Sequence, residues 1–332
     1  MFYTLQWKDN QFSLLDQTKL PKELIYLNIT TVDLLIDAIK KLAVRGAPAL
    51  GAAGAYGVAL AMAQGNKENW NEQKLNSEIA RIRNARPTAV NLAWGVDKVA
   101  VLIKNGFDEV LAAAHQIAKA DSEANRAMAK LAADWIEQKV TKRPIKALTH
   151  CNTGTLATTD WGTALGVIRE LFNRGVLSEV FADETRPLLQ GARLTAWELS
   201  QYEIPHYVLA DGAAASTIAR GEVDVVLIGA DRIAANGDSA NKIGSYPLSL
   251  AANRANIPFL VIAPESTIDR SCPSGEEIEI EMRDEKEVLE LNGIAIAPNG
   301  SRGYNPAFDV TPYDLISAIV TERAVYEGAK II

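Results

Sequence analysis

Reactive and polar side chains follow three short apolar runs in the second half of the chain. Cys151 comes just after the run Ile145–Thr149, Gln190 lies beyond Val180–Ala182, and Asp231 follows a third run. A cysteine thiolate can act as a base or nucleophile, and a carboxyl group can donate or accept a proton. Because ligands of open parallel sheets bind beyond the carboxyl ends of the strands, we expect these three loops to converge.

Cys151 and Asp231 each allow a structural interpretation beside the chemical one. Cys151 is either a small buried thiol or a reactive thiolate, which the backbone N–H groups of Asn152–Gly154 would favour. Asp231 is either ion-paired with Arg232 or Lys242 or kept protonated by burial, as a general acid. The residues alone leave both pairs of alternatives open.

Asn241 and Lys242 stand in a Gly-flanked loop before an expected helix. They could bind a ligand or simply cap that helix. His150 and His206 lie in or near expected strands, where satisfied structural histidines are the common case.

Arg45 and Arg86 share a local setting in the first half of the chain. Each precedes an expected helix start and lies close to a proline. Helix N-termini favour anions, and arginine binds phosphate through two parallel hydrogen bonds. The pair predicts a phosphate clamp, and the alternative is two solvated arginines.

The residues up to about 140 have mainly helical patterns, after short β-like runs in the first 30. Thr31 is an expected N-cap, and Gly51, Gly54 and Gly57 would let a helix pack closely against a neighbour. Expected helices cover residues 32–43, a stretch from Pro48, a third one from Pro87, and 108–140 with a break near Asp121.

The pattern changes after Arg143, where strand-length apolar runs alternate with helical stretches. This alternation is typical of βαβ units and a parallel sheet. We therefore expect an α/β protein with a mainly helical N-terminal domain, residues 1–143, and a Rossmann-like parallel-sheet domain, residues 144–332. The expected strands are Ile145–Thr149, Val180–Ala182, His206–Leu209, Asp224–Ile228 and Phe259–Ile262. The apolar segment Asp314–Val320 could pack internally or join subunits.

Composition and missing motifs exclude several classes of protein. The chain of 332 residues has 34 Lys and Arg against 41 Asp and Glu, a net charge of −7, which argues against nucleic-acid binding. The apolar stretch Ala47–Ala63 is too rich in Ala and Gly for a membrane span, and no signal peptide is visible. Two cysteines, without CxxC or HExxH, predict a reducing cytoplasm and no metal site. GxG and the Walker A pattern do not occur, which disfavours a dinucleotide cofactor and a P-loop.

Several longer stretches together resemble the 5-methylthioribose-1-phosphate isomerase family. That family shares a superfamily with the alpha, beta and delta subunits of translation initiation factor 2B. The stretches run through nearly the whole chain: Val44-Arg45-Gly46-Ala47-Pro48, Arg86-Pro87-Thr88-Ala89-Val90-Asn91-Leu92, Thr149-His150-Cys151-Asn152, 182–195, Gly229-Ala230-Asp231-Arg232-Ile233, Asn236-Gly237-Asp238, Asn241-Lys242-Ile243-Gly244 and 305–312.

The resemblance implies an enzyme, an intramolecular oxidoreductase of the aldose–ketose isomerase type. It would convert 5-methylthioribose 1-phosphate to 5-methylthioribulose 1-phosphate in methionine salvage, without cofactor or metal. The catalytic pair falls on Cys151 as thiolate and Asp231 as general acid. Substrate contacts fall on Arg45, Gly46, Ala47, Arg86, Gln190, Asn241 and Lys242. The resemblance also implies a cytoplasmic homodimer that binds a sugar phosphate and neither nucleic acid nor membrane.

Two other functions are compatible with the same superfamily. One is an isomerase of ribose 1,5-bisphosphate, which would need further basic residues for a second phosphate. The other is a non-catalytic regulatory subunit like those of initiation factor 2B. The chain departs from the isomerase pattern at Ala129–Ala132 and at Asp160-Trp161, neither of which includes an implied catalytic residue.

Overall fold

The computed structural model describes residues 2–87, 89–291 and 293–331 and divides into two compact units. Unit 1 consists of Met1–Asn125 with Gly154–Gly162, and unit 2 of Arg126–Thr153 with Thr163–Ile332. The first crossing between the units lies inside a long helix. The predicted boundary near Arg143 marks instead the passage from that helix to the first strand of unit 2.

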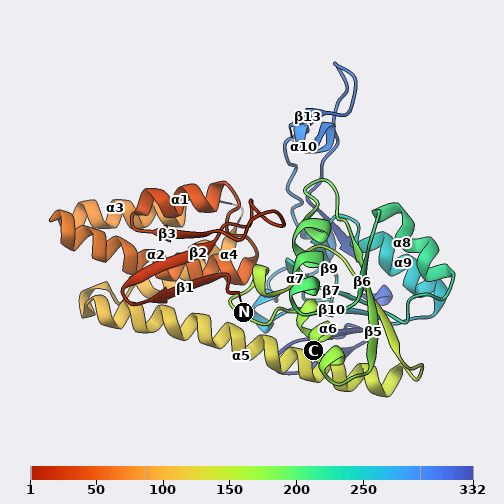
Figure 1. Ribbon diagram of the computed structural model, residues 1–332. Helices are drawn as coiled ribbons and strands as arrows, with labels where there is room; N and C mark the ends of the chain where they lie inside the picture. The colour runs from red at the N-terminus through yellow and green to blue at the C-terminus, as the bar shows by residue number, and fades with distance from the viewer. Residues whose placement is uncertain (1, 88, 292, 332) are drawn as a thin grey trace. The chain divides into compact units, whose positions relative to one another are not determined.

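Unit 1 begins with a three-stranded antiparallel sheet, as the β-like runs predicted. Its strands are β1 (Leu5–Lys8), β2 (Gln11–Leu15) and β3 (Tyr26–Ile29), in that order across the sheet. Trp7 and Phe12 are buried, and both rings stack or tilt against Tyr56 from the helical part of the unit. The sheet thus covers one side of the helices (Figure 1).

The helices of unit 1 follow the predicted pattern with three corrections. They are α1 (Val32–Lys40), α2 (Ala47–Glu68), α3 (Glu72–Arg83), α4 (Val90–Ala100) and the first part of α5 (Phe107–Lys139). The Thr31 hydroxyl accepts the Leu34 N–H, so the predicted N-cap is confirmed. Helix α3 was not predicted, α4 begins at Val90 rather than Pro87, and α5 continues through Asp121 without a break.

The glycines of α2 give helices α2 and α4 their close contact. A Cβ built on Gly54 would come within 2.5 Å of the Leu92 carbonyl oxygen, and one on Gly95 within 1.9 Å of the Gly51 carbonyl. A Cβ on Gly51 would lie 3.4 Å from the Asn91 carbonyl oxygen, so the beginnings of the two helices lie beside each other. The prediction that small residues allow close backbone packing is confirmed.

The segment Gly154–Gly162, which we call the strap, follows the Cys151 loop and packs into unit 1. The Gln17 side chain donates to the Leu156 carbonyl, at 2.7 Å. Asp121 accepts the N–H and the hydroxyl of Thr159, at 2.8 and 2.7 Å. These tertiary donors explain how α5 passes unbroken through a buried carboxyl group, whose pKa is raised by burial. Asp160 contributes its backbone and side chain to the same cluster.

Unit 2 contains a seven-stranded, mainly parallel sheet, so the α/β class is confirmed. The strand order is β16-β15-β10-β7-β4-β5-β6, and only the β15–β16 pair is antiparallel. The strands are β4 (Ile145–Thr149), β5 (Leu177–Asp183), β6 (His206–Leu209), β7 (Val225–Ile228), β10 (Phe259–Ile262), β15 (Ala318–Val320) and β16 (Val325–Glu327). All five predicted strands are present, and the buried strands β7 and β10 supply much of the core.

In unit 2, the end of α5 leads into β4, and four further helices lie between successive strands of this sheet. They are α6 (Ala164–Asn173), α7 (Ala196–Gln201), α8 (Ala214–Ala219) and α9 (Ser245–Ala255). The segment Asp314–Val320 packs internally, because it ends in the buried strand β15.

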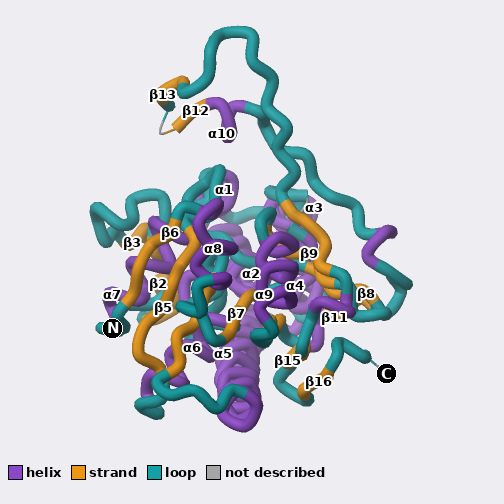
Figure 2. Tube along the Cα trace, turned by 90° about the vertical axis from the view of Figure 1, so that its right-hand side faces the viewer, coloured by secondary structure: helices purple, strands orange, loops and turns teal. Residues whose placement is uncertain are grey.

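A second, four-stranded sheet in unit 2 was not predicted. Its order is β11-β8-β9-β14, from the strands β8 (Arg232–Ala234), β9 (Ser239–Lys242), β11 (Ile268–Asp269) and β14 (Phe308–Thr311). Asn241 and Lys242 therefore lie on a strand and not in a loop. An arm with α10 (Lys286–Leu289), β12 (Glu290–Leu291) and β13 (Ile294–Ala295) extends away from both sheets (Figure 2). Within the described residues, no helix is long and apolar enough to cross a membrane.

Candidate active site

Cys151 lies directly beyond β4 with each of its polar groups engaged. Its backbone N–H donates to the Thr185 hydroxyl at 2.9 Å, and its carbonyl accepts the Thr195 hydroxyl at 2.6 Å. The Gln190 side-chain amide donates to its sulfur at 3.3 Å. The residue is only 8% exposed and has a left-handed backbone, with φ of 64°. Cys151 is thus buried, as one interpretation expected, and hydrogen bonds hold its backbone and reach its sulfur.

Gln190 reaches the sulfur because the next turn packs very tightly. Gln190 precedes a π-helical turn, Gly191–Thr195, a form that is frequent at functional sites. A Cβ on Gly191 would lie 1.7 Å from the Asp183 carbonyl oxygen, so only glycine fits there. The Gln190 side-chain oxygen is buried and accepts no hydrogen bond from the described residues. It is an available acceptor beside the sulfur.

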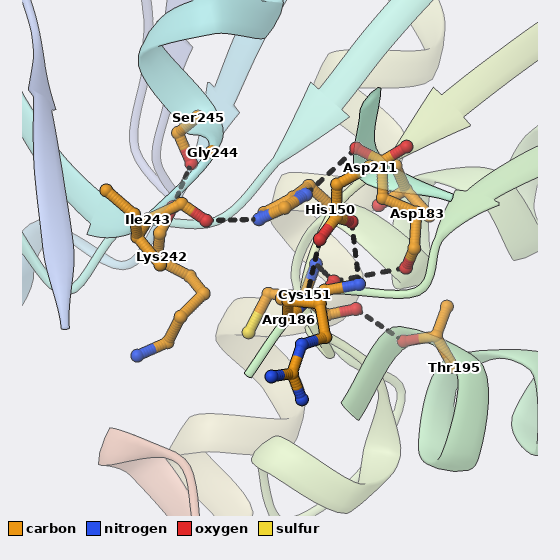
Figure 3. A network of polar contacts seen from close by, with 12 residues as sticks. His150, Cys151, Asp183, Arg186, Thr195, Asp211, Lys242, Ile243, Gly244 and Ser245 are labelled. Atoms are coloured by element: carbon orange, nitrogen blue, oxygen red, sulfur yellow. Dashed lines mark hydrogen bonds and ion pairs between the residues drawn. The ribbon is translucent and has the colours of Figure 1, made fainter. Parts of the chain in front are cut away.

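His150 joins the Cys151 loop to two other segments of unit 2 (Figure 3). Its Nδ1 lies 2.9 Å from the Asp183 carboxylate, and its Nε2 donates to the Ile243 carbonyl at 2.8 Å. Burial lowers the pKa of His150, but the hydrogen bond and charge of Asp183 outweigh it, so the pKa is raised. The expected role as a satisfied structural histidine is confirmed.

Asp211 is the third member of a cluster that also contains His150 and Asp183. Its two carboxylate oxygens accept the backbone N–H groups of Thr185 and Arg186, at 2.8 and 2.7 Å. His150, Asp183 and Asp211 bring potential metal-binding atoms within 4.8 Å of one another. Both nitrogens of His150 and both oxygens of Asp211 already have protein partners. Their arrangement therefore fits a hydrogen-bond network better than a metal centre.

Asn152, the residue after Cys151, is fixed in a similar way. Its side-chain amide donates to Glu198 at 2.7 Å and contacts the Thr195 hydroxyl at 3.3 Å. Asn152, Thr195 and Glu198 are all at most 3% exposed. The residues on both sides of Cys151 are thus held by buried polar contacts.

The third loop approaches the Cys151 loop through Gly229. A Cβ on Gly229 would lie 2.9 Å from the Thr153 methyl group, so the Thr153 side chain packs directly against the backbone at Gly229. Together with the Cys151–Gln190 contact, this confirms that the three loops converge within unit 2.

Asp231 differs from the expectation of a carboxyl group in an apolar pocket, because it is exposed. Strand β7 before it is fully buried, but Asp231 lies where that strand has ended. Its backbone N–H donates to the Ala240 carbonyl at 2.9 Å. Of the two expected ion-pair partners, Arg232 pairs with Asp269, and Lys242 donates to the Ala307 carbonyl at 2.9 Å.

Asn241 and Lys242 lead from β9 into helix α9. The Asn241 amide donates to the Ser245 hydroxyl at 2.8 Å, while Asp309 accepts the N–H groups of Gly244 and Tyr246. Asp309 therefore caps α9, a role that one interpretation gave to Asn241 and Lys242. In Figure 3, Lys242, Arg186 and the sulfur of Cys151 extend to one side of the network, opposite Asp211.

The remaining predicted contacts belong to unit 1. Arg45, Gly46 and Ala47 form the turn at the start of the 22-residue helix α2, with Gly46 as its N-cap residue. Gly46 has φ of 89°, and its Cβ would lie 2.2 Å from the Ala157 carbonyl of the strap. Arg86 is half-buried and lies before α4 in the chain. Thr88, between Arg86 and α4 in the sequence, is outside the described residues.

Sequence reasoning missed the polar residues that hold Cys151 in place. Thr185, Thr195 and Glu198 lie inside or beside a quoted motif, but threonine and glutamate are too common to stand out. The buried partner of His150, Asp183, was quoted as part of a motif without a role. The available signal was the density of polar residues at the end of the apolar strand β5.

Comparison with known proteins defines the class. The model of the Initiation factor 2 subunit family matches residues 43–328, and the chain belongs to this family. Its similar relatives include proteins named methylthioribose-1-phosphate isomerase. One from Desulforamulus reducens is 46% identical over 96% of this chain and 94% of its own length. Another, from Nitrosococcus oceani, is 49% identical over 96% of this chain and 92% of its own.

A Nocardia farcinica relative is longer than this chain. It is named a probable bifunctional methylthioribose-1-phosphate isomerase/methylthioribulose-1-phosphate dehydratase, and it is 51% identical over 98% of this chain. The chain spans 59% of that relative's length.

Two solved structures from archaea are similar over nearly the whole chain. The 5-methylthioribose 1-phosphate isomerase of Pyrococcus horikoshii OT3 has a TM-score of 0.91 at 40% identity and covers 99% of this chain and 94% of its own. A protein titled translation initiation factor eIF-2B, subunit delta, from A. fulgidus has a TM-score of 0.87, also at 40% identity. The match covers 98% of this chain and 96% of that protein's chain.

Proposed function

We propose that this chain is an aldose–ketose isomerase that converts 5-methylthioribose 1-phosphate to 5-methylthioribulose 1-phosphate in methionine salvage. Similarity to named isomerases over nearly the whole chain supports the reaction. The observation that carries the proposal is the setting of Cys151, a buried thiol with a side-chain amide donated to its sulfur. Such a donor stabilises negative charge on sulfur, which a base made from a thiol requires.

The proposed mechanism follows from the structure of the substrate. Its C1 hydroxyl carries phosphate and has no proton to lose, so the ring cannot open in the way of a free sugar. The bond between C1 and the ring oxygen must instead break with the help of an acid. Asp231 protonates the ring oxygen as that bond breaks, and the Cys151 thiolate removes the proton from C2. The resulting enol receives a proton at C1 from the Cys151 thiol and gives up the proton of its C2 hydroxyl to the Asp231 carboxylate, which leaves the ketose and restores both side chains. Because Asp231 is exposed, desolvation of its carboxyl group has to come from the bound substrate.

The substrate contacts are proposed from the same residues. Arg45 with the N-terminal turn of α2, and Arg86 before α4, would bind the phosphate. Gly46 and Ala47 would offer backbone N–H groups, and Gln190 an oxygen to a sugar hydroxyl. Asn241 and Lys242 would contact the sugar from β9. No metal or cofactor takes part in this proposal.

The decisive experiment is an assay of the purified protein with 5-methylthioribose 1-phosphate. Formation of the ketose supports the proposal, and no turnover of this substrate contradicts it. Repeating the reaction in deuterated water tests the mechanism. Solvent deuterium at C1 of the product supports proton transfer through Cys151. Its absence supports the rival mechanism, a direct hydride shift from C2 to C1.

A second candidate is a non-catalytic regulatory subunit, because one similar structure has an initiation-factor title. Such a subunit would turn over no sugar phosphate. An isomerase of ribose 1,5-bisphosphate is the third candidate, and we identify no further basic residues for its second phosphate. Parallel assays with the two sugar phosphates separate all three.

We also propose that the protein is a cytoplasmic homodimer that binds neither nucleic acid nor membrane. The two cysteines are not joined in a disulfide, which fits a cytoplasmic location. Sedimentation equilibrium should give about twice the chain mass of 36.0 kDa. A mass equal to that of one chain would contradict the dimer and leave the proposed reaction untouched.

A further inference from the structure

Cys151 and Thr185 both have a backbone conformation that side chains other than glycine rarely adopt. Their φ angles are 64° and 62°. Such a conformation is sterically strained, and it is unusual for a β-branched residue such as threonine. The two residues are adjacent in space, because the N–H of Cys151 donates to the hydroxyl of Thr185. Surrounding contacts must impose both conformations.

Two threonine hydroxyls supply these contacts at Cys151. Thr185 accepts the Cys151 N–H and donates to the Asp183 carbonyl at 3.1 Å. Thr195 donates to the Cys151 carbonyl at 2.6 Å. Both threonines are at most 1% exposed, so water cannot replace either hydroxyl without rearrangement. Both backbone polar groups of Cys151 are thus satisfied by side chains and not by a strand or helix.

Thr185 is itself fixed from a second direction. Its backbone N–H donates to Asp211 at 2.8 Å, and the tight packing of Gly191 against Asp183 places the Thr195 turn beside it. A Cβ on Gly191 would also come within 2.8 Å of the Thr185 hydroxyl. The threonines therefore belong to a rigid frame, whereas the sulfur itself contacts Gln190.

We propose that Thr185 and Thr195 are positioning residues, whose hydroxyls hold Cys151 in its left-handed conformation and so aim its sulfur at the reacting carbon of the substrate. The inference rests on the proposed isomerase function. Neither threonine removes a proton or binds substrate in this proposal. Their effect is on the step that the thiolate performs, and not on substrate affinity.

Valine and serine substitutions at position 185 test the proposal by kinetics. Thr185→Val keeps the side-chain volume but removes the hydroxyl. We expect kcat to fall about 100-fold, as for a misplaced catalytic group, while KM changes little. Thr185→Ser keeps the hydroxyl and should recover most of the lost kcat. Thr195→Val and Thr195→Ser should repeat this pattern. A folded Thr185→Val variant with wild-type kcat, or a serine variant as slow as the valine variant, would overturn the proposal.

Thr321→Val is the matched control. Thr321 is also a fully buried threonine of unit 2, and its hydroxyl accepts the N–H groups of Arg323 and Ala324, in the turn between β15 and β16. Loss of the Thr321 hydroxyl should lower the stability of the fold without lowering kcat. An equal fall of kcat in this control would show that any lost buried hydroxyl has the effect, and would overturn the specific role of Thr185.

A crystal structure of Thr185→Val tests the frame without any assay. We expect φ of Cys151 to leave the left-handed region and the distance from its sulfur to the Gln190 amide to increase beyond 3.3 Å. An unchanged Cys151 would overturn the proposal. If the wild-type protein fails to turn over methylthioribose 1-phosphate, the proposed function fails, while this measurement still decides whether the threonines hold Cys151.

Discussion

Cys151 and Asp231 occupy contrasting environments, although both follow buried strands of the same sheet. The thiol is buried, and hydrogen bonds hold both backbone polar groups of Cys151 and reach its sulfur, whereas the carboxyl group is exposed. The protein therefore positions the proposed base rigidly before substrate arrives. The proposed acid depends on the substrate to exclude water around it.

Substitution of the proposed pair gives the first prediction. Cys151→Ser and Asp231→Asn should each lower turnover of 5-methylthioribose 1-phosphate by about 100-fold or more, because each removes a proton-transfer group. Steady-state kinetics with circular dichroism as a folding check measure this. Cys272→Ser is the matched control, since Cys272 is also buried and its thiol donates to the Ser274 carbonyl, away from the Cys151 loop in the sequence. A near-normal rate in either variant of the pair would remove that residue from the mechanism.

The sequence singled out Cys151 and Gln190 as candidate site residues but not the residues that hold Cys151 in place. Cys151 and Gln190 stood out by residue type and motif, and they meet in the structure. Thr185 and Thr195 did not, because their role depends on contacts between segments that are distant along the chain. The prediction that Asp231 lies in an apolar pocket was wrong, because the burial of a strand does not extend to the residues beyond its end.

Among the elements, helix α9 depends on a residue from a distant strand. Asp309 on β14 accepts two N–H groups at the start of α9 and fixes the turn after Asn241 and Lys242. Asp309→Ala should lower the free energy of unfolding by about 1–2 kcal/mol, as for other lost helix caps. Urea denaturation measures this. Asp314→Ala, at an exposed position nearby, should change it by less than about 0.5 kcal/mol. Equal effects of both substitutions would contradict the capping role.

The contact between strands β8 and β11 predicts a pH dependence of stability. Hydrogen bonds from Ser271 and the charge of Arg232 lower the pKa of Asp269 to about 2. Because the folded-state pKa lies below the unfolded value of about 3.9, the contribution is fully present above about pH 4. It is lost as the pH falls through 2. The stability difference between the wild type and Asp269→Asn should therefore shrink from pH 6 to pH 2 in urea denaturation. A constant difference would refute this assignment.

Strong apolar patterns explain which elements were predictable. Four of the five predicted strands are runs of mainly buried residues, and helix α1 has a continuous apolar face with a threonine cap. Strand β6 is the exception, because it lies at the edge of the sheet and exposes Tyr207 and Val208. Helix α3 was missed because few of its side chains, mainly Ile79 and Ile82, are buried apolar groups. The sheet around β8 and β9 consists of short strands from distant segments, which no local pattern reveals. The prediction of a break in α5 near Asp121 was wrong, because Thr159, from outside the helix, donates a hydrogen bond to the Asp121 carboxylate.

For the whole molecule, the net charge predicts that the protein can bind a single phosphate group but does not bind nucleic acid. The net charge of −7 repels a polyanion, whereas a local pair of arginines can still bind one phosphate group. Labelled RNA should show no binding by fluorescence anisotropy at protein concentrations up to about 10 μM, where non-specific binders with dissociation constants of about 10⁻⁶ M are detected. Salt-dependent binding of RNA in that concentration range would contradict the prediction that the protein does not bind nucleic acid.

The close approach of Gly46 to Ala157 has a consequence for protein engineering. The turn that would bind phosphate and the strap that continues from the cysteine loop are fitted to each other with no room for a side chain between them. A chimera that imports residues 45–47 from a distant relative should therefore also import its counterpart of residues 154–162. Exchanging either piece alone would force two backbones into the same space.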